Sequence, residues 1–80
     1  NLHLTVRGPQ GSADWEKLLS LVRGHTSRMK LLRDDDSQDG VESTFVVEFK
    51  SLDDYHALKA ALKALSPQLE VTFLDNKGIW

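Results

Sequence analysis

Apolar and polar residues alternate in four stretches of the chain, and this period of two predicts four half-buried β-strands. The stretches are residues 2–7, 28–33, 41–50 and 69–74, and the third, VESTFVVEFK, alternates most strongly. Their apolar positions predict one inward face, made of Leu2, Leu4, Val6, Met29, Leu31, Phe45, Val47, Phe49, Leu69, Val71 and Phe73.

A helical period follows the first predicted strand. One face of this helix carries Trp15, Leu18, Leu19 and Val22. Ser12 is predicted to be its N-cap, because a serine hydroxyl can accept a hydrogen bond from the first free backbone amides. Asp14 then lies in the first turn, where the helix dipole favours an anion. Gly24 is placed to end the helix in the left-handed conformation.

A second helical period follows the third strand. Its apolar face carries Tyr55, Leu58, Leu62 and Leu65, with Ala57, Ala60, Ala61 and Ala64 allowing close approach. Ser51 and Asp54 form a variant of the capping box, which predicts where this helix begins. Pro67 predicts where it ends, since proline cannot continue a helix.

The segment DDDSQDG, between the second and third predicted strands, is predicted to be a solvated hairpin loop with Asp39–Gly40 as its turn. Its spacing matches positions 1, 3, 5 and 6 of a calcium-binding loop, but position 12 is Val46 and the flanks are strands. The region from Asp34 to Glu42 is therefore the strongest negative feature of the predicted surface. Whether it binds a cation is left open.

The element order predicts an α+β, ferredoxin-like βαββαβ fold. Its four-stranded antiparallel sheet should have the order 4-1-3-2, with two helices on one face, and residues 1–80 should form a single domain. The edge strands would then be the second and the fourth. The charges of Lys30, Arg33 and Glu70 would protect these edges from indiscriminate pairing.

The composition of the chain excludes several kinds of functional site. The 80-residue chain has a formal net charge of −2, which argues against a nucleic-acid-binding protein, and it has no cysteine, which excludes disulfides and thiolate metal sites. The three histidines, His3, His25 and His56, have no ligand partner at metal-binding spacing, so no metal site is predicted. No apolar run is long enough to span a membrane. Because the chain begins with Asn1, we expect it to be a piece excised from a longer protein.

The junction TVRGPQGS carries glycines between a strand and a helix, where such residues can cradle a phosphate. It lacks the lysine of a P-loop, and Pro9 removes one backbone donor. Val6, Gly8, Gln10 and Gly11 resemble the loop of the acylphosphatase family. That resemblance implies a hydrolase, but the family's phosphate-gripping arginine is missing, so this is the third of three interpretations.

The stretch TFVVEFKSLDDYHALKAAL resembles the third strand and second helix of an RNA-recognition motif. In that family, aromatic residues on the open sheet face stack on bases. The equivalent positions here are Thr5, Thr44 and Val46, and Glu42 replaces the usual basic residue. The alternative function is therefore an RNA-recognition-motif-like domain with degenerate stacking positions, which would bind RNA or protein.

The whole outline, from LHLTVRG through FVVEF to the closing VTF strand, resembles an ACT-type regulatory domain. More narrowly, it is similar to the soluble C-terminal domains of bacterial inner-membrane proteins such as the MgtC-like proteins. This resemblance implies a non-enzymatic regulatory or protein-interaction domain, without a cofactor, on the cytoplasmic side of the inner membrane. This segment itself would not insert into the membrane.

The partner implied by this resemblance is another copy of the chain or the rest of the parent protein, and no nucleic acid is expected. A small-molecule effector would bind the glycine-bearing turn, at Gly8, Gln10, Gly11 and Ser12. The open sheet face would form the interface, through Thr5, Arg7, Lys30, Leu32, Val46 and Leu74. The effector, the oligomeric state and the role of Trp80 do not follow from the sequence.

Overall fold

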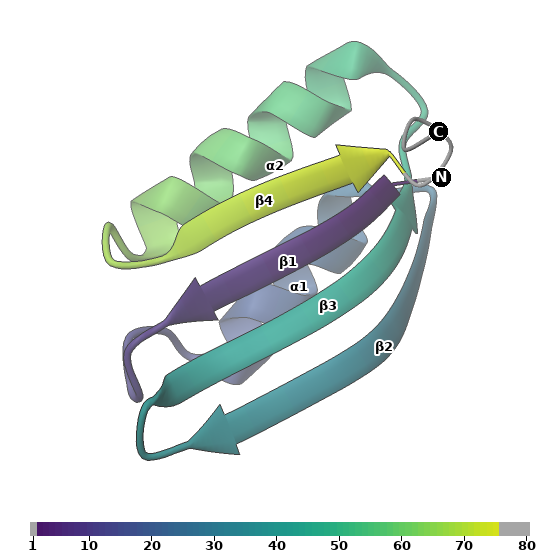
Figure 1. Cartoon of the computed structure of the whole chain (residues 1–80). Coiled ribbons are helices and arrows are strands. Elements are labelled where there is room, and N and C mark those ends of the chain that lie inside the picture. Colours follow the sequence, from purple (N-terminus) through teal and green to yellow (C-terminus); the bar gives the residue numbers. More distant parts are fainter. Residues whose placement is uncertain (1, 76–80) are drawn as a thin grey trace.

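A computed structural model of the chain describes residues 2–75 (Figure 1). Its six elements follow the predicted order. They are β1 (Leu2–Gly8), α1 (Trp15–His25), β2 (Arg28–Ser37), β3 (Gly40–Glu48), α2 (Leu52–Leu65) and β4 (Glu70–Asp75). Trp80, whose role is open, lies outside the described residues.

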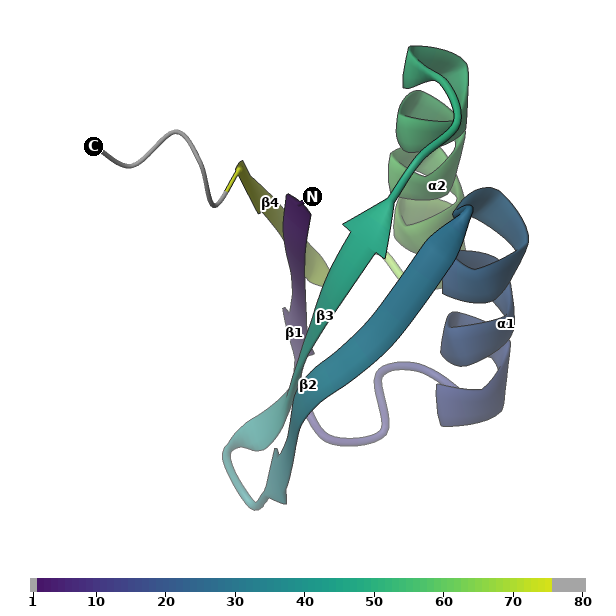
Figure 2. The same cartoon turned by 90° about the vertical axis from the view of Figure 1, so that its right-hand side faces the viewer.

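The four strands form one sheet in the order β2-β3-β1-β4, and every neighbouring pair is antiparallel. Both helices cover the same face of this sheet (Figure 2), and no other element of residues 2–75 covers the opposite face, called the open face below. The predicted ferredoxin-like fold and its strand order are therefore confirmed. β1 and β3 lie in the middle of the sheet, while β2 and β4 form its two edges.

The core lies between the sheet and the helices. Its buried apolar side chains are Leu4, Val6, Leu18, Val22, Phe45, Val47, Leu58, Leu62 and Leu69. Burial of one such side chain contributes about 1.5–3 kcal/mol. Phe45 is the largest of them, and the ring of Trp15 stacks on it with a centroid distance of 6.3 Å. The central strands and α1 are thus held together around one aromatic side chain.

The start of α1 differs from the prediction. Asp14, not Ser12, is the N-cap: one carboxylate oxygen accepts hydrogen bonds from the backbone amides of Glu16 (2.9 Å) and Lys17 (3.4 Å). Both Ser12 and Asp14 are good capping residues, and a carboxylate accepts more strongly than a hydroxyl. The helix therefore begins at Trp15, two residues later than a Ser12 cap would place it.

The end of α1 also differs. Gly24 lies inside the helix with a negative φ, and the C-cap is Thr26. The hydroxyl of Thr26 donates a hydrogen bond to the carbonyl of Val22 at 2.8 Å, which closes the last turn. A left-handed glycine is not required where a side chain satisfies a terminal carbonyl in this way.

The second helix follows its predicted signals. The hydroxyl of Ser51 accepts a hydrogen bond from the backbone amide of Asp54 at 3.2 Å, so Ser51 is the N-cap of α2. At the other end the C-cap is Ser66, immediately before Pro67. The predicted start and stop of this helix are confirmed.

The acidic segment is not the loop that the sequence predicts. β2 continues through Asp34, Asp35 and Asp36 to Ser37, so only Gln38 and Asp39 connect it to β3. The strand accommodates these carboxylates because it lies at the edge of the sheet, where its side chains remain exposed. The pairing with β3 shifts register between residues 31 and 33, which marks a β-bulge at Leu32.

Candidate functional site

The open face of the sheet is organised as rows of side chains that run across the strands. The threonine row consists of Thr44, Thr5 and Thr72. The charged row consists of Asp35, Glu42, Arg7 and Glu70. The mixed row consists of Lys30, Val46, His3 and Leu74. These rows contain five of the six predicted interface residues, all except Leu32.

Leu32 lies at the bulge of β2 and pairs with no residue of β3. The regular alternation that the sequence predicts for residues 28–33 is interrupted there, because the bulge adds one residue to the strand. Leu32 is 47% exposed, and its neighbour Leu31, predicted to be in the core, is 42% exposed. Two large aliphatic side chains are therefore accessible at the bulge, and Leu31, which pairs with the buried Phe45, lies on the helix side of the sheet.

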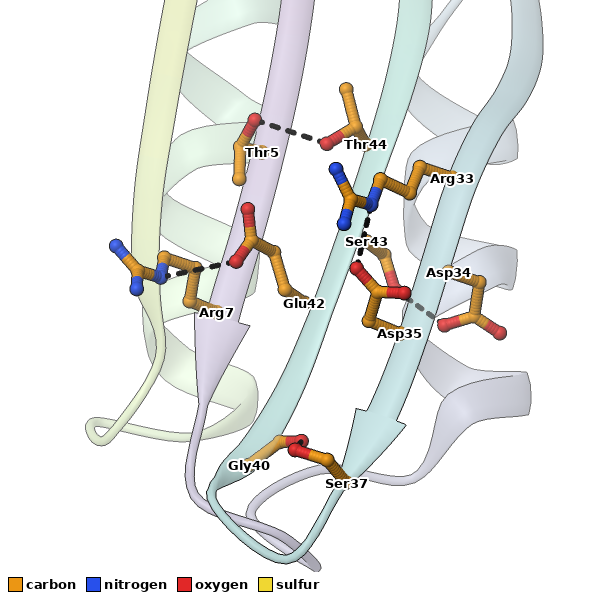
Figure 3. A network of polar contacts seen from close by, with 10 residues as sticks. All are labelled: Thr5, Arg7, Arg33, Asp34, Asp35, Ser37, Gly40, Glu42, Ser43 and Thr44. Atoms are coloured by element: carbon orange, nitrogen blue, oxygen red, sulfur yellow. Dashed lines mark hydrogen bonds and ion pairs between the residues drawn. The ribbon is translucent and has the colours of Figure 1, made fainter.

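The threonine row is polar. The hydroxyls of Thr5 and Thr44 lie 3.3 Å apart and share a hydrogen bond in which either can be the donor (Figure 3). Thr5 and Thr44, with Val46 in the next row, stand at the positions where an RNA-recognition motif would carry stacking rings. The three rows carry no phenylalanine, tyrosine or tryptophan. This face offers hydroxyls and charges in place of aromatic rings.

The charged row alternates imperfectly in sign. Arg7 lies opposite both Glu42 and Glu70, and its Nε atom is 3.6 Å from a carboxylate oxygen of Glu42. Asp35, by contrast, lies directly opposite Glu42, and two carboxylates in that position repel one another. The guanidinium of Arg33 offsets this repulsion by approaching Asp35 to 2.6 Å (Figure 3). Both ion pairs are largely solvent-exposed, so each contributes little to stability.

A polar groove of about 910 Å³ lies at the end of the sheet where β1 meets the β2–β3 hairpin. Its charged lining comes from Arg7, Asp35, Asp36, Asp39, Glu42 and Glu70. Gly8 and Pro9 form part of its wall, so the predicted effector turn reaches this groove only through its first residues. Of the four predicted effector residues, Gly8 alone lines it.

The other predicted effector residues have individual structural roles. The amide nitrogen of Gln10 donates a hydrogen bond to Asp36 at 3.4 Å, which ties the turn to the acidic end of β2. Gly11 has a φ of 78°, a left-handed conformation that glycine adopts without strain. The hydroxyl of Ser12 is buried without a hydrogen-bond partner in the described part of the chain.

Close contacts explain two of the glycines near this groove. A Cβ atom on Gly8 would lie 2.6 Å from the hydroxyl of Ser12, and one on Gly40 would lie 2.5 Å from the carbonyl oxygen of Gly8. Gly40 also has a φ of 142°, where side chains are strained. Gly40 therefore lets the start of β3 approach the end of β1, and Gly8 leaves room for the side chains of Ser12 and Leu69. The sequence shows a glycine at each position, but it does not show which segment packs against that glycine.

A second groove, of about 550 Å³, lies at the opposite end of the strands and is lined mainly by apolar side chains. Its aromatic residues are Phe49, Tyr55 and Phe73, with ring centroids between 4.8 and 6.0 Å apart. The sequence pattern places these residues on the apolar faces of their strands and helix. It does not predict the groove, because strand and helix periodicities do not reveal which apolar residues meet at the end of a sheet.

The acidic residues and histidines do not come together as a metal site. Among residues 2–75 no group of three histidine, aspartate or glutamate side chains is arranged to hold a metal ion. The cation site left open for the acidic hairpin therefore has no support here, because β2 alternates its carboxylates between the two sides of the sheet: Asp34 accepts a hydrogen bond from Ser43 on the helix side, while Asp35 points to the open face.

Comparisons with family models, curated proteins and solved structures found no match to this chain. Within residues 2–75, neither helix combines the length and the apolar character needed to cross a bilayer.

Proposed function

We propose that this chain is a non-enzymatic regulatory or protein-interaction domain, of the ACT-like type, that works by pairing through its sheet. The observation that carries the proposal is the outer edge of β2. This edge strand is exposed along nearly its whole length, and Leu31 and Leu32 are accessible at its bulge. An exposed edge strand is a ready template for pairing with another chain.

The open face supports the same function. It presents Val46 and Leu74 among hydroxyls and charges of both signs, a mixture that resembles the surfaces of non-obligate protein interfaces. The partner would be a second copy or the rest of a larger bacterial membrane protein, with this domain on the cytoplasmic side of the inner membrane.

The polar groove beside Gly8 is the proposed effector site. Its position at the end of β1, next to the hairpin, means that a bound molecule would contact both β1 and β2. An effector there would change how readily the outer edge of β2 is presented to a partner. The small-molecule class that fits is polar and charged, since carboxylates dominate the lining and Arg7 supplies a cation.

Two measurements on the isolated domain test this function. Sedimentation velocity from micromolar to millimolar concentration should show reversible self-association. NMR titrations with amino acids, nucleotides, divalent cations and single-stranded RNA should move resonances of residues 8–12 with one small-molecule class. RNA-dependent shifts at Thr5, Thr44 and Val46 would instead support the RNA-binding alternative and overturn the proposal.

A further inference from the structure

We infer that two copies of this chain pair antiparallel along β2, around a two-fold axis that passes between Leu32 and Arg33. The two four-stranded sheets then become one continuous sheet. This inference rests on the proposed function and adds to it the partner, the strand and the register.

The first observation is that the outer edge of β2 is long and free. β2 has 10 residues, the most of any strand, and every residue from Lys30 to Ser37 is exposed. On the side away from β3, alternate backbone amides and carbonyls of an edge strand have no partner strand. Antiparallel addition of a strand would satisfy these groups without rearranging the fold.

The second observation is the division of charge along this strand. Its first part carries Arg28, Lys30 and Arg33, and its second part carries Asp34, Asp35 and Asp36. Two copies in antiparallel orientation bring the basic part of each strand against the acidic part of the other. A parallel orientation would align like charges. The edge is thus complementary to itself, which makes a second copy the favoured occupant.

The bulge restricts the register. Before it, Arg28 and Lys30 point to the open face, whereas after it Arg33 and Asp35 do so. Residues directly opposite in an antiparallel pair must share a face of the sheet. An axis between Leu32 and Arg33 satisfies this condition. It places Lys30 opposite Asp35 of the partner subunit, and it sets the two bulges against each other.

The neighbouring registers are less favourable. A shift of one residue sets open-face side chains opposite helix-side ones. A shift of two residues that moves the axis between Leu31 and Leu32 keeps the faces matched, but it places Lys30 opposite Arg33 of the partner subunit. Like charges in that position repel. The same shift also sets Arg28 opposite Asp35 of the partner subunit. The opposite shift, with the axis between Arg33 and Asp34, sets Arg33 on the open face against the helix-side Asp34 of the partner subunit. The axis between Leu32 and Arg33 matches the faces and sets no like charges directly opposite one another, so this register is favoured.

The charged row gives independent support. Within one copy, Asp35 lies opposite Glu42, and among residues 2–75 its ion-pair partner is Arg33, which offsets the repulsion. Lys30 of the partner subunit would stand on the other side of Asp35, where residues 2–75 of its own copy place no strand. A carboxylate can accept several hydrogen bonds, so both cations can be accommodated. A line of side chains would then run from the charged row of one copy to Lys30 of the partner subunit.

The test uses two charge-reversal variants, Lys30→Asp and Asp35→Lys. Each variant alone juxtaposes like charges twice in a symmetric dimer, so its dimer dissociation constant should rise about tenfold or more. Mixed in equal amounts, the two variants regain opposite charges at both contacts and should form a heterodimer close to wild-type affinity. Sedimentation velocity at low ionic strength measures the affinities, and native mass spectrometry identifies the heterodimer.

The matched controls are Lys17→Asp and Glu16→Lys, two exposed positions at the start of α1. They carry the same charge changes as the test pair but lie on α1, on the covered side of the sheet. Both should dimerise like the wild type, and their mixture should gain nothing further. Circular dichroism melting curves confirm that all four variants are folded.

Three results would overturn the inference. Single variants that dimerise like the wild type exclude this register, while leaving the proposed interaction function intact. A mixture that stays monomeric excludes the Lys30–Asp35 contact. A wild-type chain that stays monomeric up to millimolar concentration excludes self-pairing altogether, and the effector titration then decides the proposed function by itself.

Discussion

The two faces of the sheet use the same strands for different purposes. Phe45 and Thr44 are neighbours in β3, yet Phe45 is fully buried under α1 and Thr44 stands on the open face. The covered face is apolar and closely packed around a single core. The open face has a hydrogen-bonded threonine pair, exposed ion pairs and a few aliphatic side chains.

This difference indicates where stability and recognition reside. A buried aromatic side chain contributes several times more to stability than an exposed ion pair. Residues of the open face and of the outer edge of β2 can therefore change with little effect on the fold. They are the positions at which a partner can be specified at low energetic cost.

The largest expected effect comes from the direct contrast between the two neighbours in β3. Phe45→Ala should lower the free energy of unfolding by about 3–5 kcal/mol, because it removes a buried ring and leaves a cavity. Thr44→Ala, the matched control, should cost only about 0.2–1 kcal/mol, the range of a cross-strand pair. Urea denaturation followed by circular dichroism measures both. Equal losses would show that the open face is not exposed as described.

The covered face was also the part that the sequence predicted well. Period-two alternation located the central strands because a one-residue slip would expose their apolar side chains. The helix containing Leu58 and Leu62 was bounded correctly by Ser51 and Pro67. Strand order followed from the element order, since few topologies accommodate it.

The sequence predicted less at the edge, where burial no longer constrains the pattern. Adjacent leucines at positions 31 and 32 conceal the bulge, and the three aspartates that follow suggest a loop. Local sequence alone cannot show that β3 pairs with this acidic segment. Alternation did place Thr5, Arg7, Lys30, Val46 and Leu74 on the open face. Only the register of β2 against β3 shows that Lys30 and Asp35 lie on the same face, one on each side of the bulge.

The next largest effect concerns the place where the two central strands meet the hairpin. Gly40→Ala should destabilise the chain by more than about 1 kcal/mol, because its new Cβ would clash with the carbonyl of Gly8 at a strained φ. Gly24→Ala is the control, since nothing lies within 4 Å and the residue is helical. It should stabilise by about 0.5–1 kcal/mol. The melting temperature should fall for Gly40→Ala and rise for Gly24→Ala. Two shifts of the same sign would contradict the prediction.

A smaller effect distinguishes the two candidate caps of α1. Asp14→Ala should cost about 0.5–2 kcal/mol, because two backbone amides lose their acceptor. Ser12→Ala should be neutral or slightly stabilising, since its buried hydroxyl has no partner among residues 2–75. Chemical denaturation of both variants gives the comparison. A larger loss of stability for Ser12→Ala than for Asp14→Ala would show that Ser12 is the N-cap, as the sequence predicts.

The smallest effect is on the open face itself and depends on the order of charges in the charged row. Arg7 stands between Glu42 and Glu70, so Arg7→Ala should cost about 0.2–1 kcal/mol and leave neighbouring carboxylates without their cation. Glu42→Ala should cost less, because it also removes the repulsion with Asp35. Denaturation at low and high salt measures both variants. The difference between them should shrink with salt, since screening weakens contacts between exposed charges. If the stability difference between the two variants does not change with salt, packing of the Arg7 side chain is responsible for it. The charges of the charged row then remain available to contact a partner.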